Sequence, residues 1–209
     1  MSKKFKLGVI GNPIEHSLSP FIHSRFSRNE NINVEYLPYK VTDVDFDLFI
    51  REFFSDKDSK GLNVTLPHKK KAAEIEGVIS REAKYINAVN TIVSDEKKIF
   101  LYSTDGIGFI NDMENKNFAL KEKNILIIGA GAAAESVIYR LAKSEVNHIT
   151  ILNRTQEKAD RLIRKFSNMT SINTESNSEA PYDLIINGSS AGLTGEFKPI
   201  ENILIDECT

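Results

Sequence analysis

Short apolar runs alternate with amphipathic stretches along the chain, a pattern that predicts an α/β fold. In the first half, the apolar runs predicted as strands are 5–11, 34–41 (interrupted by Pro38), 61–66, 87–95 and 98–106. The amphipathic stretches predicted as helices are 19–29, 43–56 and 67–77. We expect Ser19 to cap the first of these helices, with Pro20 at its first position, and Pro67 to open the third.

After a polar stretch at 111–124, the second half has a different order of elements. Residues 124–155 follow the order strand, glycine-rich turn, helix, strand, which is a βαβ unit. The elements predicted beyond it are a helix at 157–166, a loop at 167–181 and strands at 182–192 and 202–209. We therefore expect two domains in tandem, 1–105 and 106–209. The second lacks the closing helix of a doubly wound fold, so we expect it to be incomplete; the alternative is a compact natural terminus.

Composition narrows the class of protein. The formal net charge is −2 over 209 residues, which gives no general attraction to nucleic acid or anionic membranes. A single cysteine, Cys208, excludes an intrachain disulfide framework. The apolar run after the basic N-terminus breaks at residues 11–13, too early for a signal peptide or membrane span. The four histidines lack metal-ligand spacing. We expect a soluble cytoplasmic protein without a metal.

The glycine-rich turn of the βαβ unit matches the pattern of a dinucleotide-binding site. Gly129 permits the tight turn, and Gly131 lets backbone amides at the helix start approach a pyrophosphate. Ala134 keeps the third position small, so that helix and strand can pack closely. The residues expected around the pyrophosphate are Gly129, Ala130, Gly131, Ala132 and Ala133. The alternative is a packing turn in an α/β domain that binds no nucleotide.

The end of the second strand of this unit indicates which dinucleotide is bound. An NAD site usually has a carboxylate here for the ribose hydroxyls, but this chain reads Asn153-Arg154-Thr155. Arg154 can pair with a 2′-phosphate, and Lys158 follows one helical turn later. The pattern favours NADP. The alternative is that both cations are surface charges at a strand–helix junction.

Seven segments resemble those of the shikimate dehydrogenase family, in order and at similar spacings. They are "GVIGNPIEHSLSP", "GLNVTLPHK", "AVNTI", "STDGIGF", "GAGAAAES", "NRT" and "INGSSAG". The resemblance spans essentially the whole chain and implies a shikimate-binding α/β domain followed by a Rossmann-type NADP-binding domain. It implies reversible reduction of 3-dehydroshikimate to shikimate, in the pathway to chorismate and the aromatic amino acids. Family members occur as monomers and dimers, which leaves a homodimer open.

The residue types of the first half suit a small carboxylic acid with three ring hydroxyls. The residues at positions matching the family's motifs are Ser17, Ser19, Asn63, Thr65, Lys69, Asn90 and Asp105. Serines at a helix N-terminus can hold a carboxylate. Asn63 and Thr65 alternate along a strand end and point to one face, while Asn90 and Asp105 close two further strands. Each residue alone is more often a turn or cap residue, so the expectation rests on the set.

Hydride transfer to a ketone must be coupled to proton transfer onto its oxygen, which requires a positioned acid/base. Lys69 matches the family lysine in "NVTLPHK", and Asp105 matches the aspartate of "TDG". We expect Lys69 to be the acid/base and Asp105 to orient it; the alternative is a surface ion pair. Because successive helical residues turn by about 100°, Lys70 and Lys71 would face elsewhere as solvated charges.

Three features depart from the family pattern. The family more often reads Asn-Ala-Thr-Ser from position 187, so Gly188 and Ser189 depart conservatively, while Asn187 and Ser189 are expected near the nicotinamide. Ser103 replaces a usual asparagine. Family members also continue past the equivalent of Thr209, with a further strand, a tyrosine and a C-terminal helix that brings a glutamine to the ligand. If the 209 residues are the whole molecule, we expect weak shikimate binding, impaired activity and better-preserved NADP binding.

Two other functions stay open. A quinate/shikimate dehydrogenase of broader specificity is one, although the missing carboxylate at Asn153-Arg154 argues against NAD use. A non-catalytic nucleotide-binding fragment is the other, although the chain retains both Lys69 and Asp105.

Overall fold

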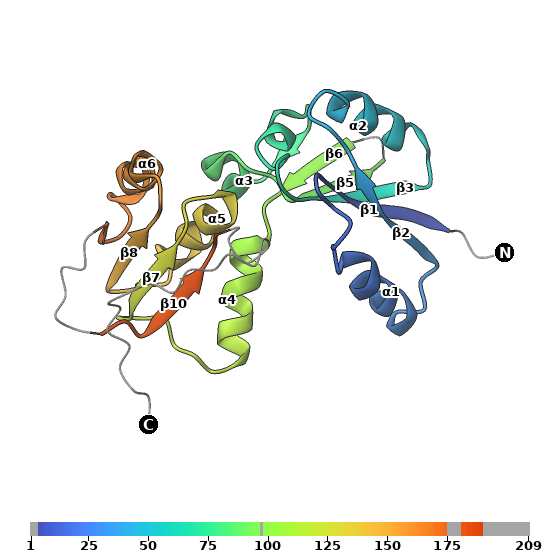
Figure 1. Cartoon of the computed structure of the whole chain (residues 1–209). Helices are drawn as coiled ribbons and strands as arrows, with labels where there is room; N and C mark the ends of the chain where they lie inside the picture. Colours follow the sequence, from blue (N-terminus) through green and yellow to red (C-terminus); the bar gives the residue numbers. More distant parts are fainter. Residues whose placement is uncertain (1–3, 97, 175–180, 190–209) are drawn as a thin grey trace. The chain divides into compact units, whose positions relative to one another are not determined.

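The computed structural model describes residues 4–96, 98–174 and 181–189. They form two compact units divided between Thr104 and Asp105, and each unit is built on its own β-sheet (Figure 1). The α/β class expected from the sequence is confirmed. The strand predicted at 202–209 lies outside the described residues.

The first unit contains a six-stranded mixed sheet with the order β2-β1-β3-β5-β6-β4. Its strands are β1 (Phe5–Gly11), β2 (Val34–Lys40), β3 (Ser59–Val64), β4 (Val78–Ile79), β5 (Thr91–Asp95) and β6 (Lys98–Tyr102). Its helices are α1 (Ser19–Asn29), α2 (Phe46–Ser55), α3 (Arg81–Ile86) and the 3₁₀ helix η1 (Lys71–Glu74). β1 runs parallel to β2 and β3, whereas β5 runs antiparallel to β3 and β6.

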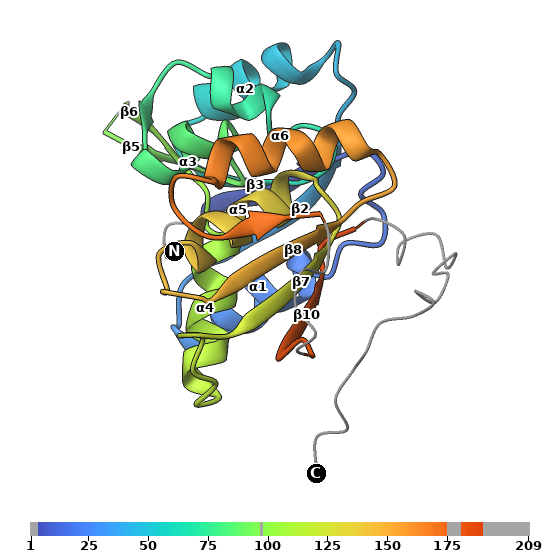
Figure 2. The same ribbon diagram turned by 90° about the vertical axis from the view of Figure 1, so that its left-hand side faces the viewer.

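Helices α1 and α2 lie on opposite faces of this sheet (Figures 1 and 2). Because side chains alternate along a strand, the neighbours Val9 and Ile10 of β1 enter different cores. Ile10 belongs to the larger core, together with Phe46 of α2. Val9 packs on the other face with Ile14 and Tyr36. The central strands are therefore covered on both faces, as is usual where parallel strands are joined by helices.

Three predicted elements of the first unit differ in the structure. Strand β2 continues through Pro38 without interruption. Because β2 lies at the edge of the sheet, it has a neighbouring strand on one side alone, and the missing N–H of proline breaks no hydrogen bond to a second strand. Helix α1 begins at Ser19 with Leu18 at the cap position, so the predicted Ser19 cap is wrong. The helix predicted at 67–77 is instead a turn followed by the 3₁₀ helix η1. β4 and α3 were not predicted.

The second unit contains a parallel sheet with the order β10-β7-β8-β9. Its strands are β7 (Asn124–Ile128), β8 (His148–Leu152), β9 (Ile172–Asn173) and β10 (Leu184–Asn187). Its helices are α4 (Asp105–Asn115), α5 (Ala132–Leu141) and α6 (Gln156–Phe166). The predicted βαβ unit is confirmed as β7-α5-β8. The polar stretch at 111–124 begins inside α4, and the loop predicted at 167–181 contains β9, because buried Ile172 pairs with β8.

Helix α5 is fixed to both of its helical neighbours by buried polar groups. Helices α4 and α5 pack side by side (Figure 1). The amide of Gly106 in α4 donates to the hydroxyl of Ser136 in α5, with the nitrogen 2.9 Å from the oxygen. On α6, Arg161 and Lys165 lie 3.0 and 2.8 Å from the carboxylate oxygens of fully buried Glu135. These bonds hold the helix that follows the glycine-rich turn.

Candidate functional site

The carboxyl ends of β1 and β3 meet where the winding of the first sheet reverses, the usual ligand position in open α/β sheets. The amide of Asn12 donates to the carbonyl of Leu66 at 2.9 Å, which joins the loop after β1 to the turn after β3. Because β5 runs antiparallel to β3, it begins at the same edge, with Thr91 opposite Asn63. The topology therefore gathers most of the segments that carry the predicted substrate ligands.

Ser17 and Ser19 lie at the start of α1, and both are half-buried. The Ser17 hydroxyl oxygen accepts a hydrogen bond from the Ser19 amide at 3.3 Å. The Ser19 side chain hydrogen-bonds the hydroxyl of Tyr36 on β2. The contact with a helical amide thus belongs to Ser17, the reverse of the prediction, and Ser19 is engaged with the sheet.

Side-chain hydrogen bonds continue from Tyr36 along the edge of the sheet. The Tyr36 hydroxyl donates to Oδ1 of Asn63 at 2.7 Å. Nδ2 of Asn63 donates to Oγ1 of Thr91 at 3.3 Å, and Thr91 donates to Oδ1 of Asn90 at 3.0 Å. Each of these side chains is oriented by the one before it. We call the run from Ser19 through Tyr36, Asn63, Thr91 and Asn90 to Thr104 the edge network.

Asn90 ends the edge network by binding Thr104 twice. Its Oδ1 accepts from the Thr104 amide at 2.9 Å, and its Nδ2 donates to Thr104 Oγ1 at 3.0 Å. Thr104 immediately precedes Asp105, so Asn90 fixes the backbone next to the predicted catalytic carboxylate. Asn90 stands before β5 and Asp105 opens α4, so neither closes a strand as predicted. Thr65 packs its methyl against Gly11 and, within the described residues, is not part of the edge network.

The turn after β3 holds Lys69, which is half-buried. Its carbonyl accepts from the amide of Val89 at 2.8 Å, a tertiary bond that replaces a helical one. The preceding residue, His68, is fully buried, with Nε2 2.7 Å from the carbonyl of Val41. Its Nδ1 lies 2.9 Å from the Asp43 carboxylate, within ion-pair distance but without hydrogen-bond geometry. The backbone on both sides of the Lys69 side chain is therefore fixed.

Lys71 helps to hold this turn. Its Nζ donates to the carbonyl of Asp43 at 2.6 Å, lies 3.2 Å from the Asp47 carboxylate and sits 5.3 Å from the centre of the Phe46 ring. The prediction that Lys71 is a solvated charge is wrong, because the start of α2 offers it a carbonyl, a carboxylate and a ring. Lys70 is exposed, as predicted.

The two glycines of the glycine-rich turn in the second unit differ in what requires them. Gly129 has φ +108°, and a Cβ there would approach the backbone of Gly188 to 3.0 Å. A Cβ at exposed Gly131, the N-cap of α5, would meet no atom within 4 Å in the part of the chain that the structure describes. Packing therefore requires the first glycine but not the second, which leaves the first amides of α5 accessible to an anion. The turn also contains Ala130 and, in the first turn of α5, Ala132, Ala133 and buried Ala134.

The junction between β8 and α6 presents two cations. Nδ2 of Asn153 donates to the carbonyl of Thr155 at 2.7 Å and closes this turn. Arg154 and Lys158 are exposed, and within the described part of the chain neither side chain has a hydrogen-bond or ion-pair partner. A phosphate would therefore meet no competing carboxylate on these two groups, an arrangement that suits a 2′-phosphate.

The carboxyl end of β10 forms a compact polar turn. Oδ1 of Asn187 accepts from both the amide and the hydroxyl of Ser189, at 3.0 and 2.7 Å. Between them lies Gly188, where a Cβ would approach Ala134 of α5 to 3.0 Å. The small residues predicted here thus permit close packing of this turn on the start of α5.

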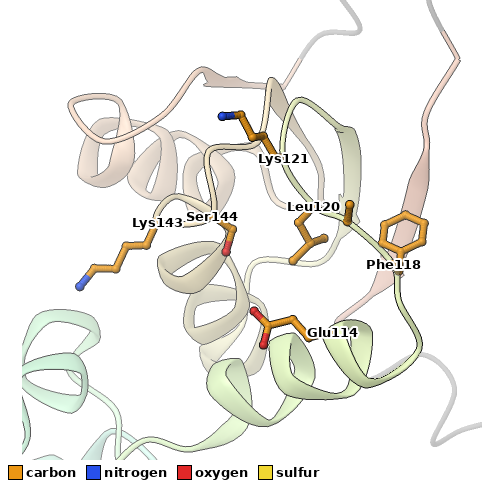
Figure 3. A pocket seen from close by; sticks show the side chains of 7 residues that line it. Glu114, Phe118, Leu120, Lys121, Lys143 and Ser144 are labelled. Carbon is orange, nitrogen blue, oxygen red and sulfur yellow. The ribbon is translucent and has the colours of Figure 1, made fainter.

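Among the described residues, no three His, Cys, Asp or Glu side chains are grouped as a metal site, and no helix is long and apolar enough to cross a membrane. A pocket of about 400 Å³ lies near the carboxyl ends of α4 and α5 (Figure 3). It contains none of the predicted ligands. Its Lys143 extends away from Leu120 and donates to the Tyr139 hydroxyl at 2.8 Å. We assign it no ligand.

Three residues of the edge network were not predicted. Thr91 and Thr104 lie in the quoted segments "AVNTI" and "STDGIGF", next to predicted ligands, so the segments themselves carried the signal. Tyr36 had no such signal, because strand alternation predicts its burial but not the partner of its hydroxyl.

A polar edge network in one α/β unit and a glycine-turn βαβ unit in the other define a two-domain enzyme of the dinucleotide-dependent class. Residues 9–92 match the family described as shikimate dehydrogenase substrate binding domain, and residues 112–193 match shikimate / quinate 5-dehydrogenase. The chain belongs to the shikimate dehydrogenase family.

Relatives from bacteria and archaea support this assignment. The shikimate dehydrogenase (NADP(+)) of Legionella pneumophila (strain Corby) is 40% identical over 193 residues, which are 91% of this chain and 71% of the relative. The enzyme of the same name from Nitrosopumilus maritimus is 36% identical over 215 residues, a match that spans 100% of this chain and 78% of the relative.

Solved structures agree with these sequence matches. Shikimate dehydrogenase from Aquifex aeolicus has a TM-score of 0.85 and 34% identity, and the match covers 97% of this chain and 75% of that one. The Thermus thermophilus shikimate 5-dehydrogenase in complex with NADP(H) and shikimate has a TM-score of 0.77 and 26% identity. That match covers 88% of this chain and 68% of the Thermus chain.

Proposed function

We propose that this protein catalyses the reversible NADP-dependent reduction of 3-dehydroshikimate to shikimate. The observation that carries the proposal is the edge network, which brings together hydroxyl-binding side chains in a chain of the shikimate dehydrogenase family. Residues 1–105 would bind the substrate and residues 106–209 the cofactor. As an enzyme of a biosynthetic pathway, it would work in the cytoplasm, and it would not bind nucleic acid. Whether it forms a homodimer can be tested by light scattering.

Each end of the substrate has matching groups. The hydroxyls of Ser17 and Ser19, at the start of α1, would bind the carboxylate of shikimate, helped by the helix amides. The amides of Asn63 and Asn90 offer donors and acceptors to the ring hydroxyls. Thr65, beside the turn that holds Lys69, completes the proposed set.

The residues of the second unit fit NADP in two respects. A Cβ at Gly131 would collide with no atom of the described residues, so the glycine suits close approach of a pyrophosphate to the start of α5. Arg154 and Lys158 offer positive charge to a 2′-phosphate. When bound, NADPH supplies the hydride. Asn187 and Ser189 would line the part of the site that holds the nicotinamide.

Lys69 would supply the proton that accompanies hydride addition. As the substrate carbon accepts the hydride, the Lys69 ammonium donates a proton to the oxygen that becomes the new hydroxyl; in the oxidation of shikimate, neutral Lys69 accepts that proton. Asp105 would orient the ammonium. The fixed turn around Lys69 suits this role, because proton transfer depends on the position of the donor atom.

The test follows NADPH absorbance while shikimate is oxidised by the wild-type protein and by Lys69→Ala. General acid–base catalysis is worth about 10²- to 10⁴-fold, and we expect turnover to fall by that amount. Lys70→Ala, the exposed neighbour, is the matched control and should retain wild-type turnover. Absence of shikimate-dependent NADPH formation by the wild-type protein would refute the proposed function. Equal turnover in Lys69→Ala would refute only the role of Lys69. Quinate and NAD⁺, offered as alternative substrates, test the broader specificity.

A further inference from the structure

Tyr36 occupies a position in which its ring and its hydroxyl have different tasks. The residue lies on β2 and is 9% exposed. Its ring stacks on His23 of α1, with centroids 4.1 Å apart and planes 8° from parallel. Stacking and burial account for an aromatic ring here, and phenylalanine would satisfy both. The hydroxyl needs another explanation, because a buried polar group is costly unless it forms hydrogen bonds.

The Tyr36 hydroxyl bridges two side chains from different elements. It hydrogen-bonds the side chain of Ser19 at the start of α1 and donates to Oδ1 of Asn63 on β3 at 2.7 Å. Burial raises the pKa of Tyr36 to about 12, so the group stays a protonated donor at neutral pH. Because Oδ1 accepts from Tyr36, Nδ2 is the end of the Asn63 amide directed at Thr91.

Tyr39, on the same strand, shows what a tyrosine without this bridge looks like. Its ring packs against Phe49 and Phe53 of α2, on the other side of the sheet. Among the described residues its hydroxyl makes no hydrogen bond. Both tyrosines contribute aromatic packing to a core, but only Tyr36 joins the edge network.

From these contacts we infer that Tyr36 is a positioning residue for shikimate, whose hydroxyl holds Ser19 and Asn63 in the orientation that binds the two ends of the substrate. The inference rests on the proposed function, which assigns the carboxylate to Ser19 and a ring hydroxyl to Asn63. Tyr36 itself need not touch the substrate. Its loss would leave the Ser19 hydroxyl without its partner on β2 and let the Asn63 amide rotate.

The test replaces one oxygen atom by hydrogen in Tyr36→Phe, with Tyr39→Phe as the matched control. A neutral hydrogen bond corresponds to a factor of about 2 to 12, so we expect the KM for shikimate of Tyr36→Phe to rise about threefold to tenfold. Since the hydroxyl does not take part in proton transfer, kcat and the KM for NADP⁺ should change by less than about twofold. Tyr39→Phe should match the wild type in all three.

A double-mutant cycle distinguishes positioning from simple destabilisation. Asn63→Ala removes the group that Tyr36 orients, so adding Tyr36→Phe should raise KM for shikimate by much less than it does in the wild type. Isothermal titration with shikimate gives the same comparison as a dissociation constant, without turnover.

The outcomes separate the two claims. A wild-type protein that neither oxidises nor binds shikimate refutes the inference together with the proposed function. A wild-type protein that does so, while Tyr36→Phe keeps its KM and dissociation constant, refutes the inference alone. The inference is also refuted if Tyr36→Phe lowers kcat and the melting temperature and raises both KM values, because that pattern indicates general destabilisation. It is refuted as well if the KM increase in the double variant equals the product of the increases in Tyr36→Phe and Asn63→Ala.

Discussion

The two units build their candidate sites in different ways. In the first unit three of the proposed ligands, Ser19, Asn63 and Asn90, belong to one network of side-chain hydrogen bonds. In the second unit the turn depends on glycine geometry and backbone amides, and the two proposed phosphate ligands, Arg154 and Lys158, stand without side-chain partners among the described residues.

This difference predicts how each site responds to substitution. Groups in one hydrogen-bond network are coupled, so removing one disturbs the orientation of the next. Exposed groups that do not bond one another are not held in place by one another, so replacing one leaves the other in position to bind its ligand. The expected order of effects begins with Lys69→Ala, as described above, and continues with the following four changes.

Asn90→Ala should be the most damaging change within the edge network. Asn90 is 9% exposed and holds both the amide and the hydroxyl of Thr104. Its loss removes the side-chain acceptor of the Thr104 amide and leaves the hydroxyl only its 3.4 Å contact with the Thr91 hydroxyl. We expect kcat/KM for shikimate to fall by more than about tenfold and unfolding free energy by about 1–3 kcal/mol. Steady-state kinetics and denaturant unfolding measure the two effects, with exposed Asn111→Ala as control. Additive effects of Asn90→Ala and Asn63→Ala would contradict the coupled network.

Arg154→Ala should weaken NADP⁺ binding without disturbing the first unit. A charge-assisted hydrogen bond is worth about 1.5–3 kcal/mol, so we expect KM for NADP⁺ to rise at least about tenfold, with KM for NAD⁺ and shikimate nearly unchanged. Arg164→Ala, an exposed arginine of α6, is the matched control. Adding Lys158→Ala should multiply the effect. A strongly non-additive pair would show that the two cations are not independent.

Lys71→Met should affect stability and turnover more than the same substitution at Lys70 does. The substitution removes the bond to the Asp43 carbonyl and the ion pair with Asp47, so the turn loses one of its anchors. We expect the free energy of unfolding to fall by about 1 kcal/mol, which corresponds to about 2–4 °C in melting temperature, and turnover to fall severalfold. Lys70→Met should change neither. Equal melting temperatures for the two variants would refute the anchoring role of Lys71.

Asp183→Asn should produce the smallest effect, and one that depends on pH. Hydrogen bonds from Lys123 and from the Asn124 amide lower the pKa of the Asp183 carboxyl below its usual 3.8. A lowered folded-state pKa means that this stabilisation is present above pH 3.8 and is lost as pH falls below it. The melting temperature of the variant should therefore lie slightly below wild type at pH 7, by about 2 °C, and approach it below pH 3.8. A gap that persists in acid would contradict this.

The sequence predicted the central strands, the βαβ unit and most of the helices, because long apolar runs leave few alternatives. It failed where tertiary bonds decide the local structure. The turn around Lys69 is not an α-helix because its carbonyl binds Val89, and β9 forms because Ile172 has a buried place beside β8. Pro38 fits within β2 because that strand is at an edge, which depends on strand order and not on local sequence.

The candidate site divides in the same way. Family motifs located Ser17, Asn63, Lys69 and other proposed ligands by position along the chain. They could not reveal that Tyr36 bridges Ser19 to Asn63, because that contact depends on how β2 and β3 flank β1. The roles of all these residues stay predictions until the variants are measured.

The close packing of α4 on α5 limits how this protein can evolve. A Cβ at Gly106 would collide with the carbonyl oxygen of Ser136, which is a backbone atom present whatever residue stands at 136. A smaller side chain at 136 therefore could not compensate for alanine at 106, and a second-site suppressor would have to move a whole helix. Gly106 directly follows Asp105, so the position after the proposed catalytic carboxylate should be among the least open to genetic drift in this chain.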